Sequence, residues 1–194
     1  DALGNETCTL VGHDWGGFTS WLTAIRAPER IDRLVVMSIN NPWEQPRSAR
    51  LAALVLAYQV PVATPLLRTV VQPRVVRTVL KMGVGPDHHW PDEDLRLYAD
   101  AFRRPAHAAA GSALYRTFLT RELPALGRNC YADRRVDVPV TLLAGDADEV
   151  TGPATTFHGI ERHAADVTKH VIAGAGHFLP EEKPREVTDI ILQT

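Results

Sequence analysis

An aspartate at the centre of a glycine-rich turn is the first candidate for chemistry in this sequence. Residues 12–17 read Gly-His-Asp-Trp-Gly-Gly, which places Asp14 between Gly12 and Gly16. A short apolar run precedes the turn and a helical pattern follows it. We expect glycine to be needed at both flanking positions, because a Cβ there would collide with the neighbouring strand and helix. The pattern therefore predicts a nucleophile elbow that presents Asp14 at the carboxyl end of a strand.

The type of the central residue determines which reaction such a turn supports. A serine in this place attacks carbonyl carbons, whereas a carboxylate displaces a leaving group at an sp³ carbon and forms an alkyl-enzyme ester. Water can then cleave that ester at its carbonyl carbon and regenerate the carboxylate. The alternative interpretation is a plain turn in which Asp14 only caps the following helix.

Two further polar residues follow apolar runs later in the chain. Asp148 lies in a loop three residues after Gly145, and His177 follows a Gly-Ala-Gly sequence. Asp146 is the competing acid, and His177 taken alone is equally compatible with an exposed loop histidine. Because the carboxyl ends of parallel strands meet at one edge of a sheet, we expect Asp148 and His177 to lie close to the elbow.

The three candidates suggest a division of roles. His177 would take a proton from water, and Asp148 would orient the imidazole and stabilise its charged form. The backbone N–H of Trp15 would stabilise the oxyanion that forms when water attacks the ester on Asp14.

The elements that must position these residues follow from the hydrophobic pattern. A helical block between the second and third strands predicts a lid over residues 43–128, inserted in a core formed by residues 1–42 and 129–194. The fold class is α/β with a mostly parallel sheet. The expected strands are 8–11, 33–39, 138–144 and 167–173, and the expected helices are 18–26, 48–58, 65–82, 91–103, 107–122, 153–163 and 180–192.

Composition narrows the classes of protein that are compatible with the sequence. The 194 residues fit one domain with an insertion, and a net charge of -2 argues against nucleic-acid or membrane partners. Cys8 and Cys130 suggest no disulfide framework, and Cys8 is expected to be buried in its strand. The other histidines show no metal-ligand spacing, so we expect no metal and no cofactor. A cytoplasmic location is the interpretation that follows.

With these motifs in view, the chain resembles the epoxide hydrolases of the α/β-hydrolase fold, the class with an aspartate nucleophile. Residues 12–17 look like that family's elbow, and residues 174–178 look like its histidine loop. Two lid tyrosines hold the epoxide oxygen in that family. Here Tyr58 is followed by a Gln and, seven residues on, by Pro65. Tyr115 is followed by a basic residue and lies after the Phe-Arg-Arg-Pro sequence at residues 102–105.

The resemblance implies a hydrolase that converts an epoxide to a vicinal diol. Asp14, Asp148, His177, Tyr58 and Tyr115 would be its catalytic residues. Its partners would be a small hydrophobic epoxide and water, and we allow a homodimer as its assembly. One alternative is a haloalkane dehalogenase, because that family has a similar elbow. Another is a non-catalytic fragment or binding module of the same fold.

The front of the chain departs from the family pattern. Members of that family carry further strands before the elbow, and a His-Gly-x-Pro loop that supplies a second oxyanion donor. Nothing here matches that loop, so we expect this chain to lack the N-terminal part and the elbow strand to form an exposed sheet edge.

Overall fold

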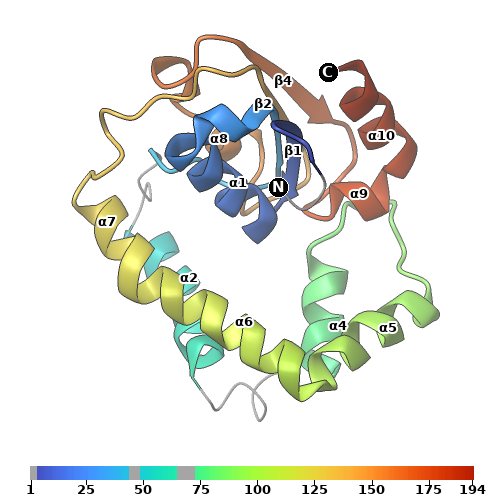
Figure 1. Ribbon diagram of the computed structural model, residues 1–194. Helices are drawn as coiled ribbons and strands as arrows, with labels where there is room; N and C mark the ends of the chain where they lie inside the picture. Colours follow the sequence, from blue (N-terminus) through green and yellow to red (C-terminus); the bar gives the residue numbers. More distant parts are fainter. Residues whose placement is uncertain (1–3, 44–48, 65–72) are drawn as a thin grey trace. The chain divides into compact units, whose positions relative to one another are not determined.

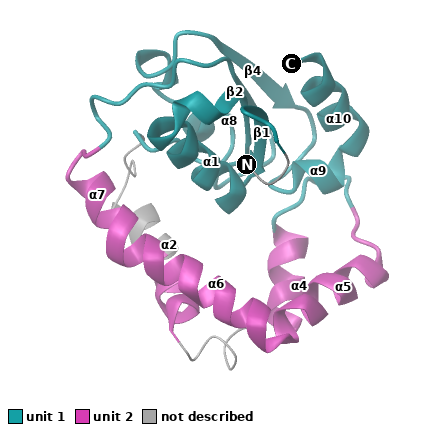
Figure 2. Cartoon of the chain, viewed as in Figure 1, with its two compact units in different colours: residues 1–44, 83–88, 131–194 teal, residues 45–82, 89–130 magenta. Residues whose placement is uncertain are grey.

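The computed structural model describes residues 4–43, 49–64 and 73–194. The chain forms two compact units, which Figure 2 shows in different colours. The sheet unit consists of residues 1–44, 83–88 and 131–194. The helical unit consists of residues 45–82 and 89–130. Residues 83–88 thus return to the sheet unit from the middle of the helical sequence, which the hydrophobic pattern did not indicate.

The sheet unit contains four parallel strands in the order β1-β2-β3-β4 (Figure 1). These are β1 (Cys8–His13), β2 (Ile31–Met37), β3 (Val140–Gly145) and β4 (Val167–Ile172). Helix α1 (Trp15–Arg26) joins β1 to β2. The α/β fold class and the four expected strands are confirmed, with ends that differ by one or two residues. All four carboxyl ends lie at the same edge of the sheet.

Alternating side chains divide the interior of the sheet unit into two cores. On one face, Trp21 of α1 packs with Leu34 and Leu142. On the other face, Val35 and Leu143 pack against helices α9 (Leu179–Glu182) and α10 (Pro184–Gln193). Burying one such side chain contributes about 1.5–3 kcal/mol, so the two cores fix the strands that position the candidate site.

Strand β1 forms one edge of the sheet in the described part of the chain, as expected from the sequence. The prediction that Cys8 is buried is wrong, because an edge strand leaves its first residues open to solvent. Cys8 and Cys130 are both exposed and free. The Cys8 Sγ contacts the carbonyl oxygen of Arg30 at 3.7 Å.

Two expected helices of the sheet unit are broken. The segment predicted as one helix at 153–163 forms α8 (Pro153–Thr156) and a separate 3₁₀ turn, because Gly159 between them has a left-handed φ of 65°. The segment predicted at 180–192 forms α9 and α10. Pro184 explains this break, because a proline disfavours helical backbone in the residue before it, here Lys183.

The helical unit begins with α2 (Ala49–Ala63) and α4 (Pro73–Met82), followed by α5 (Asp92–Arg103) and α6 (Pro105–Thr117). A π-helical turn at Phe118–Glu122 then leads into α7 (Leu123–Gly127). Helix α2 continues beyond the predicted end at residue 58, because Pro61 lies in its last turn and disturbs few helical hydrogen bonds. Residues 65–72 of the predicted helix 65–82 lie outside the described residues.

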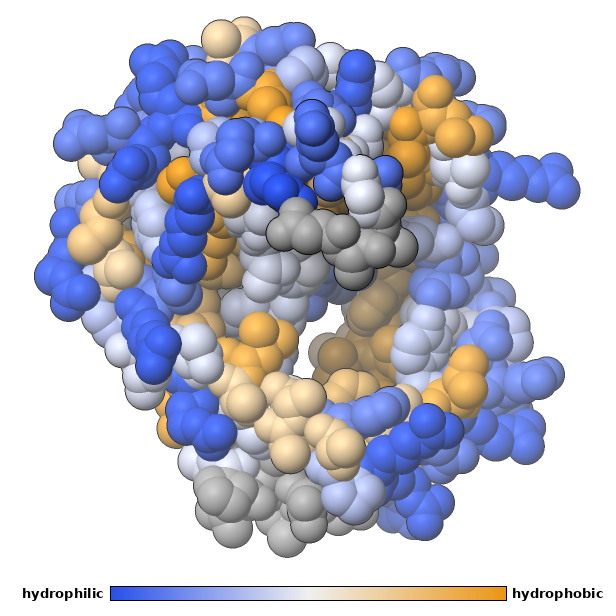
Figure 3. Space-filling view, in the orientation of Figure 1, coloured by the Kyte–Doolittle hydropathy of each residue, from blue (hydrophilic) through white to orange (hydrophobic). Residues whose placement is uncertain are grey.

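Contacts between α2 and α6 involve polar as well as apolar groups. The Ser112 hydroxyl donates to the carbonyl of Val62 at 3.0 Å, and Gln59 is buried. Figure 3 shows apolar side chains on the surface in the same orientation as Figure 1. Of the large exposed hydrophobic residues that the structure describes, most belong to this unit: Leu56, Tyr58, Val60, Val75, Val79, Met82, Leu97, Phe102 and Leu114.

Candidate active site

The turn after β1 holds Asp14 in a strained backbone conformation. Asp14 has φ 49° and ψ -122°, a combination that costs a non-glycine residue on the order of 1–3 kcal/mol. Its N–H donates to the carbonyl of Met37 at 3.0 Å, and its own carbonyl accepts the N–H of Phe18 at 3.0 Å. Asp14 occupies the N-cap position of α1, yet its side chain makes no capping hydrogen bond. The carboxylate is therefore not used as a cap, unlike in the plain-turn alternative.

The glycines of this turn have unequal roles. A Cβ added to Gly12 would lie 2.5 Å from the carbonyl carbon of Gly16, so this position requires glycine as predicted. The prediction for Gly16 is wrong, because a Cβ there would meet no described atom within 4 Å. Gly17 has the close neighbours instead: its Cβ would lie 2.7 Å from Cγ2 of Ile39. The difference arises because Gly17, not Gly16, faces the sheet from α1.

Asp148 lies in the loop after β3 and is held by a dense set of hydrogen bonds. Its Oδ1 accepts the N–H groups of Val150 and Thr151, each at 2.9 Å. Its Oδ2 accepts the Thr151 hydroxyl at 2.7 Å and faces Nδ1 of His177 at 3.1 Å. The competing acid, Asp146, instead accepts the N–H of Gly174 at 2.7 Å. Of the two acids, Asp148 is thus the one that contacts the histidine.

His177 lies between two carboxylates. Its Nδ1 faces Asp148, and its Nε2 lies 3.8 Å from Oδ1 of Asp14. Because an ionised carboxylate only accepts hydrogen bonds, Nδ1 carries the proton and Nε2 is left directed at Asp14. The separation on the Asp14 side exceeds a hydrogen bond, which is common for catalytic pairs without substrate.

Burial and charge act in opposite directions on this group of residues. Burial of the His177 ring lowers its pKa, but the hydrogen bond that the ring donates to Asp148 and the charges of Asp14, Asp148 and Glu182 outweigh it, so the pKa is raised. Burial raises the pKa of Asp148, but its hydrogen bonds to His177 and Thr151 lower it to about 2. Asp148 is therefore ionised at neutral pH and stabilises the imidazolium form of His177.

Two residues that the motifs did not single out complete the surroundings of His177. The Thr151 Oγ1 lies 3.0 Å from Nδ1 of His177 and so contacts both His177 and Asp148. His13 donates from Nε2 to the carbonyl of His177 at 2.7 Å, and the two rings lie 5.0 Å apart. Burial lowers the pKa of His13, although the hydrogen bond to the His177 carbonyl opposes this. His13 directly precedes Asp14, which was the one sequence signal for it.

Trp15 is the first residue of α1 and directly follows Asp14. The N-terminal end of a helix favours negative charge, because its backbone N–H groups and the helix dipole point at that end. The N–H of Trp15 is thus suited to stabilise an oxyanion that forms on the side-chain carboxyl group of Asp14.

The two predicted tyrosines belong to the helical unit, Tyr58 to α2 and Tyr115 to α6. Their ring centroids lie 5.9 Å apart in an edge-on arrangement. Half of the Tyr58 surface is exposed, although its neighbour Gln59 is buried. Pro65, the third part of the first tyrosine motif, lies outside the described residues. The helical unit thus brings together two phenols from separate sequence motifs.

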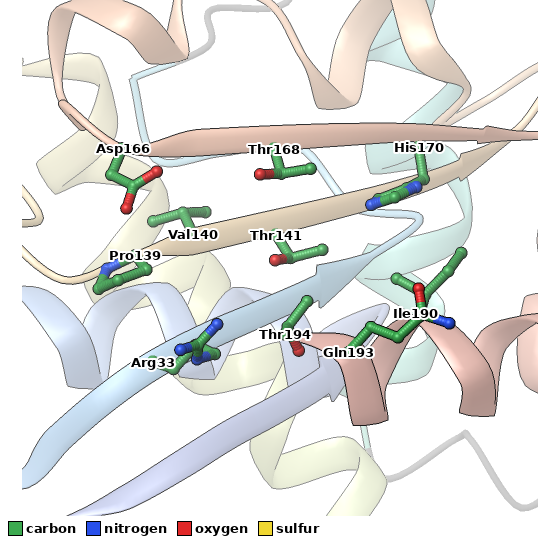
Figure 4. Close-up of a pocket in the computed structure, with 10 residues that line it drawn as sticks. All are labelled: Arg33, Pro139, Val140, Thr141, Asp166, Thr168, His170, Ile190, Gln193 and Thr194. Atoms are coloured by element: carbon green, nitrogen blue, oxygen red, sulfur yellow. The ribbon is translucent and has the colours of Figure 1, made fainter.

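A pocket of about 290 Å³ lies elsewhere on the sheet unit (Figure 4). It is lined by Arg33 of β2, Thr141 of β3 and Thr168 of β4, near the amino ends of these strands, and by the end of α10. The candidate triad lies at the carboxyl ends, so this pocket is not part of it. Within the described ranges, no cluster of three or more His, Cys, Asp or Glu side chains could bind a metal ion. Among the described helices, none has the length and apolar character needed to span a membrane.

Known proteins similar to this chain include several epoxide hydrolases. Epoxide hydrolase 4 of Homo sapiens is 26% identical over 211 residues, which cover 98% of this chain and 54% of the relative. Epoxide hydrolase 2 of Siraitia grosvenorii is 27% identical, over 98% of this chain and 70% of the relative. The chain spans about half the length of the first of these. The predicted resemblance to epoxide hydrolases is confirmed.

Solved structures show the same fold at low identity. Wild-type Cfl2 from Burkholderia cenocepacia has a TM-score of 0.80 at 22% identity, over 99% of this chain and 66% of that one. A variant of an epoxide hydrolase from Bacillus megaterium has a TM-score of 0.74 at 22% identity, over 99% and 70%. The α/β-hydrolase fold family matches residues 1–184, and the chain therefore belongs to that family.

Proposed function

We propose that this chain carries the reaction site of an epoxide hydrolase that works through an ester on Asp14. The observation that supports this most is the position of His177 between two carboxylates, 3.1 Å from Asp148 and 3.8 Å from Asp14. A base held in this way can act on an ester of Asp14. A serine-type esterase is not supported, because the residue at the centre of the elbow is an aspartate.

In the first half of the proposed reaction, a carboxylate oxygen of Asp14 attacks one carbon of the epoxide. The carbon–oxygen bond of the ring breaks, and the electron pair moves to the epoxide oxygen. A phenol O–H of Tyr58 or Tyr115 donates a proton to that oxygen, which becomes the first hydroxyl of the product. The helical unit would act as the lid that brings the two phenols to the substrate.

In the second half, neutral His177 takes a proton from water at Nε2, and the hydroxide attacks the carbonyl carbon of the Asp14 ester. The N–H of Trp15 stabilises the oxyanion, and Asp148 stabilises the imidazolium. The ester bond then breaks, the alkoxide of the product takes the proton from the imidazolium of His177, and the vicinal diol leaves. The proton left on the Asp14 carboxyl passes through water to the phenolate of the first half, which restores both groups. The oxygen of the attacking water becomes one of the two carboxylate oxygens of Asp14.

Apolar exposure on the helical unit is consistent with a small hydrophobic epoxide as substrate. Five apolar residues within the expected lid lie outside the part of the chain whose side chains the structure describes: Leu51, Leu54, Val55, Leu66 and Leu67. The homodimer and the cytoplasmic location stay predictions from the sequence.

The test is to trap the ester. His177→Gln removes the base of the second half and should leave the first half active. After mixing with an aryl epoxide, we expect a stable adduct by intact mass, mapped to the peptide that carries Asp14. In wild-type protein, turnover in water labelled with heavy oxygen should place label in Asp14. Turnover that never places label there would contradict the ester mechanism.

The competing functions give different results in the same assays. Halide release from chloroalkanes or bromoalkanes, with no diol from epoxides, would favour a haloalkane dehalogenase that uses the same three residues. A cooperative melt and saturable ligand binding without turnover would favour a non-catalytic binding module. An adduct that appears only on a longer chain, extended upstream of Asp1, would show that the reaction needs further residues.

A further inference from the structure

Glu182, the last residue of α9, accepts three hydrogen bonds from backbone N–H groups. Its Oε2 accepts the N–H of Gly85 at 2.7 Å and that of Gly176 at 2.9 Å. Its Oε1 accepts the N–H of Phe178 at 3.0 Å. Gly176 and Phe178 are the two neighbours of His177 in sequence, so one carboxylate holds the backbone on both sides of the proposed base.

The third donor, Gly85, belongs to the segment Gly83–His88, which packs directly on the histidine loop. The N–H of His177 donates to the carbonyl of Gly83 at 2.6 Å. A Cβ on Gly176 would lie 2.4 Å from that carbonyl oxygen, and a Cβ on Gly85 would lie 2.1 Å from the carbonyl oxygen of Gly174. The two backbones thus approach as closely as glycine allows, and Glu182 lies where their N–H groups converge.

We infer that Glu182 is a positioning residue for His177: its carboxylate fixes the histidine loop to the segment Gly83–His88, and its negative charge favours the imidazolium. The catalytic consequence rests on the proposed function, whereas the structural and electrostatic parts do not. Glu182 makes no hydrogen bond to the ring itself, so it acts through the backbone and through space.

The charges around His177 support this assignment. Burial lowers the pKa of His177, and Glu182 is one of the three carboxylates whose charge opposes that effect. Asp148 and Asp14 are the other two, and Asp148 also hydrogen-bonds the ring. The titratable groups that act on His177 from the surrounding elements are His13 of β1, Asp14 of the elbow, Asp148 of the loop after β3 and Glu182 of α9. Asp87 and His88 belong to the segment Gly83–His88.

The neighbouring residue provides a matched control. Glu181 is exposed, whereas the carboxylate that accepts the N–H groups of Gly85, Gly176 and Phe178 is that of Glu182. Glu181→Gln therefore removes the same charge one residue away and keeps the histidine loop intact. Glu182→Asp is the complementary variant, because it keeps the charge but shortens the side chain by one methylene.

The test is an NMR titration of the His177 ring, with amide hydrogen exchange measured on the same samples. Glu182→Gln should lower the His177 titration midpoint by several tenths of a pH unit and speed exchange at Gly85, Gly176 and Phe178. Glu182→Asp should speed exchange at the same amides with a smaller change of midpoint, and Glu181→Gln should do neither.

Three results would overturn the inference. They are an unchanged midpoint and unchanged exchange in Glu182→Gln, an equal shift of the midpoint in Glu181→Gln, or unchanged exchange in Glu182→Asp. None of these measurements needs substrate, so a failure to trap an Asp14 adduct bears only on the proposed function. If the adduct does form, its hydrolysis in Glu182→Gln should show the same shift of its pH profile towards lower pH.

Discussion

The two carboxylates that flank His177 are the same chemical group in opposite surroundings. The side chain of Asp148 is 2% exposed and accepts hydrogen bonds at both oxygens. The side chain of Asp14 is 37% exposed, makes no capping bond and lies 3.8 Å from the ring. The backbone of Asp14 has a positive φ, whereas that of Asp148 does not.

The difference shows what each carboxylate is suited to do. A carboxylate whose lone pairs are all engaged is a weak nucleophile, but it fixes the orientation and tautomer of a histidine. A carboxylate that is exposed and pushed out of a strained turn remains available to an incoming electrophile. Hydrogen bonding thus suits Asp148 to orient the histidine and leaves Asp14 open to an electrophile, although both residues are aspartates.

The largest effect is expected from Asp14→Asn, which removes the exposed carboxylate. An amide does not displace the epoxide oxygen, so diol formation should fall by on the order of 10⁴-fold or more. Diol release is measured by chromatography on protein with an unchanged melting curve. Diol release near the wild-type rate would show that Asp14 is not the nucleophile.

A large but smaller effect is expected from Asp148→Asn. An amide partner allows the wrong tautomer of His177, so the rate of ester hydrolysis should fall by up to about 10⁴-fold. The pKa of His177 should also fall, because the charge and the hydrogen bond of Asp148 raise it. The matched control is Asp146→Asn, which alters the acid that binds the N–H of Gly174. Equal losses in both variants would contradict the assignment.

Asp148→Asn should also change how the stability of the fold depends on pH. Because the pKa of Asp148 is lowered from 3.8 to about 2, its ionisation stabilises the fold above pH 3.8, and this stability is lost as the pH falls through 2. The shift corresponds to roughly 2 kcal/mol in the free energy of unfolding. Urea unfolding across this range should show that loss in wild type but not in Asp148→Asn.

The smallest of these effects is expected from Thr151→Val, which keeps the shape of the side chain but removes the hydroxyl shared by Asp148 and His177. Loss of this hydrogen bond should lower the rate of ester hydrolysis by about tenfold. Thr151→Ser should restore most of that rate, and its pH profile should match wild type. A serine variant as slow as the valine variant would indicate a packing role only.

Local signals in the sequence predicted the elements that bring the candidate triad together. The apolar runs mark each strand, and the glycine-rich turns mark where Asp14, Asp148 and His177 leave the sheet. These signals work because the carboxyl ends of parallel strands share one edge, so that positions distant in sequence lie close in space.

Contacts between distant segments were not predictable in this way. The need for glycine at position 17 depends on Ile39, which lies beyond the helix that follows the turn. The contacts of Thr151 and Glu182 depend on how the loop after β3 and helix α9 meet the histidine loop, and no spacing rule predicts that arrangement. The break at Gly159, in contrast, had a local cause that the helical pattern concealed.

The segment Gly83–His88 affects how this protein could be recombined with its relatives. A graft that exchanges residues 45–130 as one block would also replace the carbonyl of Gly83 and the N–H of Gly85, which contact His177 and Glu182. An exchange of the helical unit with that of a relative should therefore transfer residues 45–82 and residues 89–130 as two separate segments. Residues 83–88 should stay with the part of the chain that carries His177, although they lie in the middle of the helical sequence.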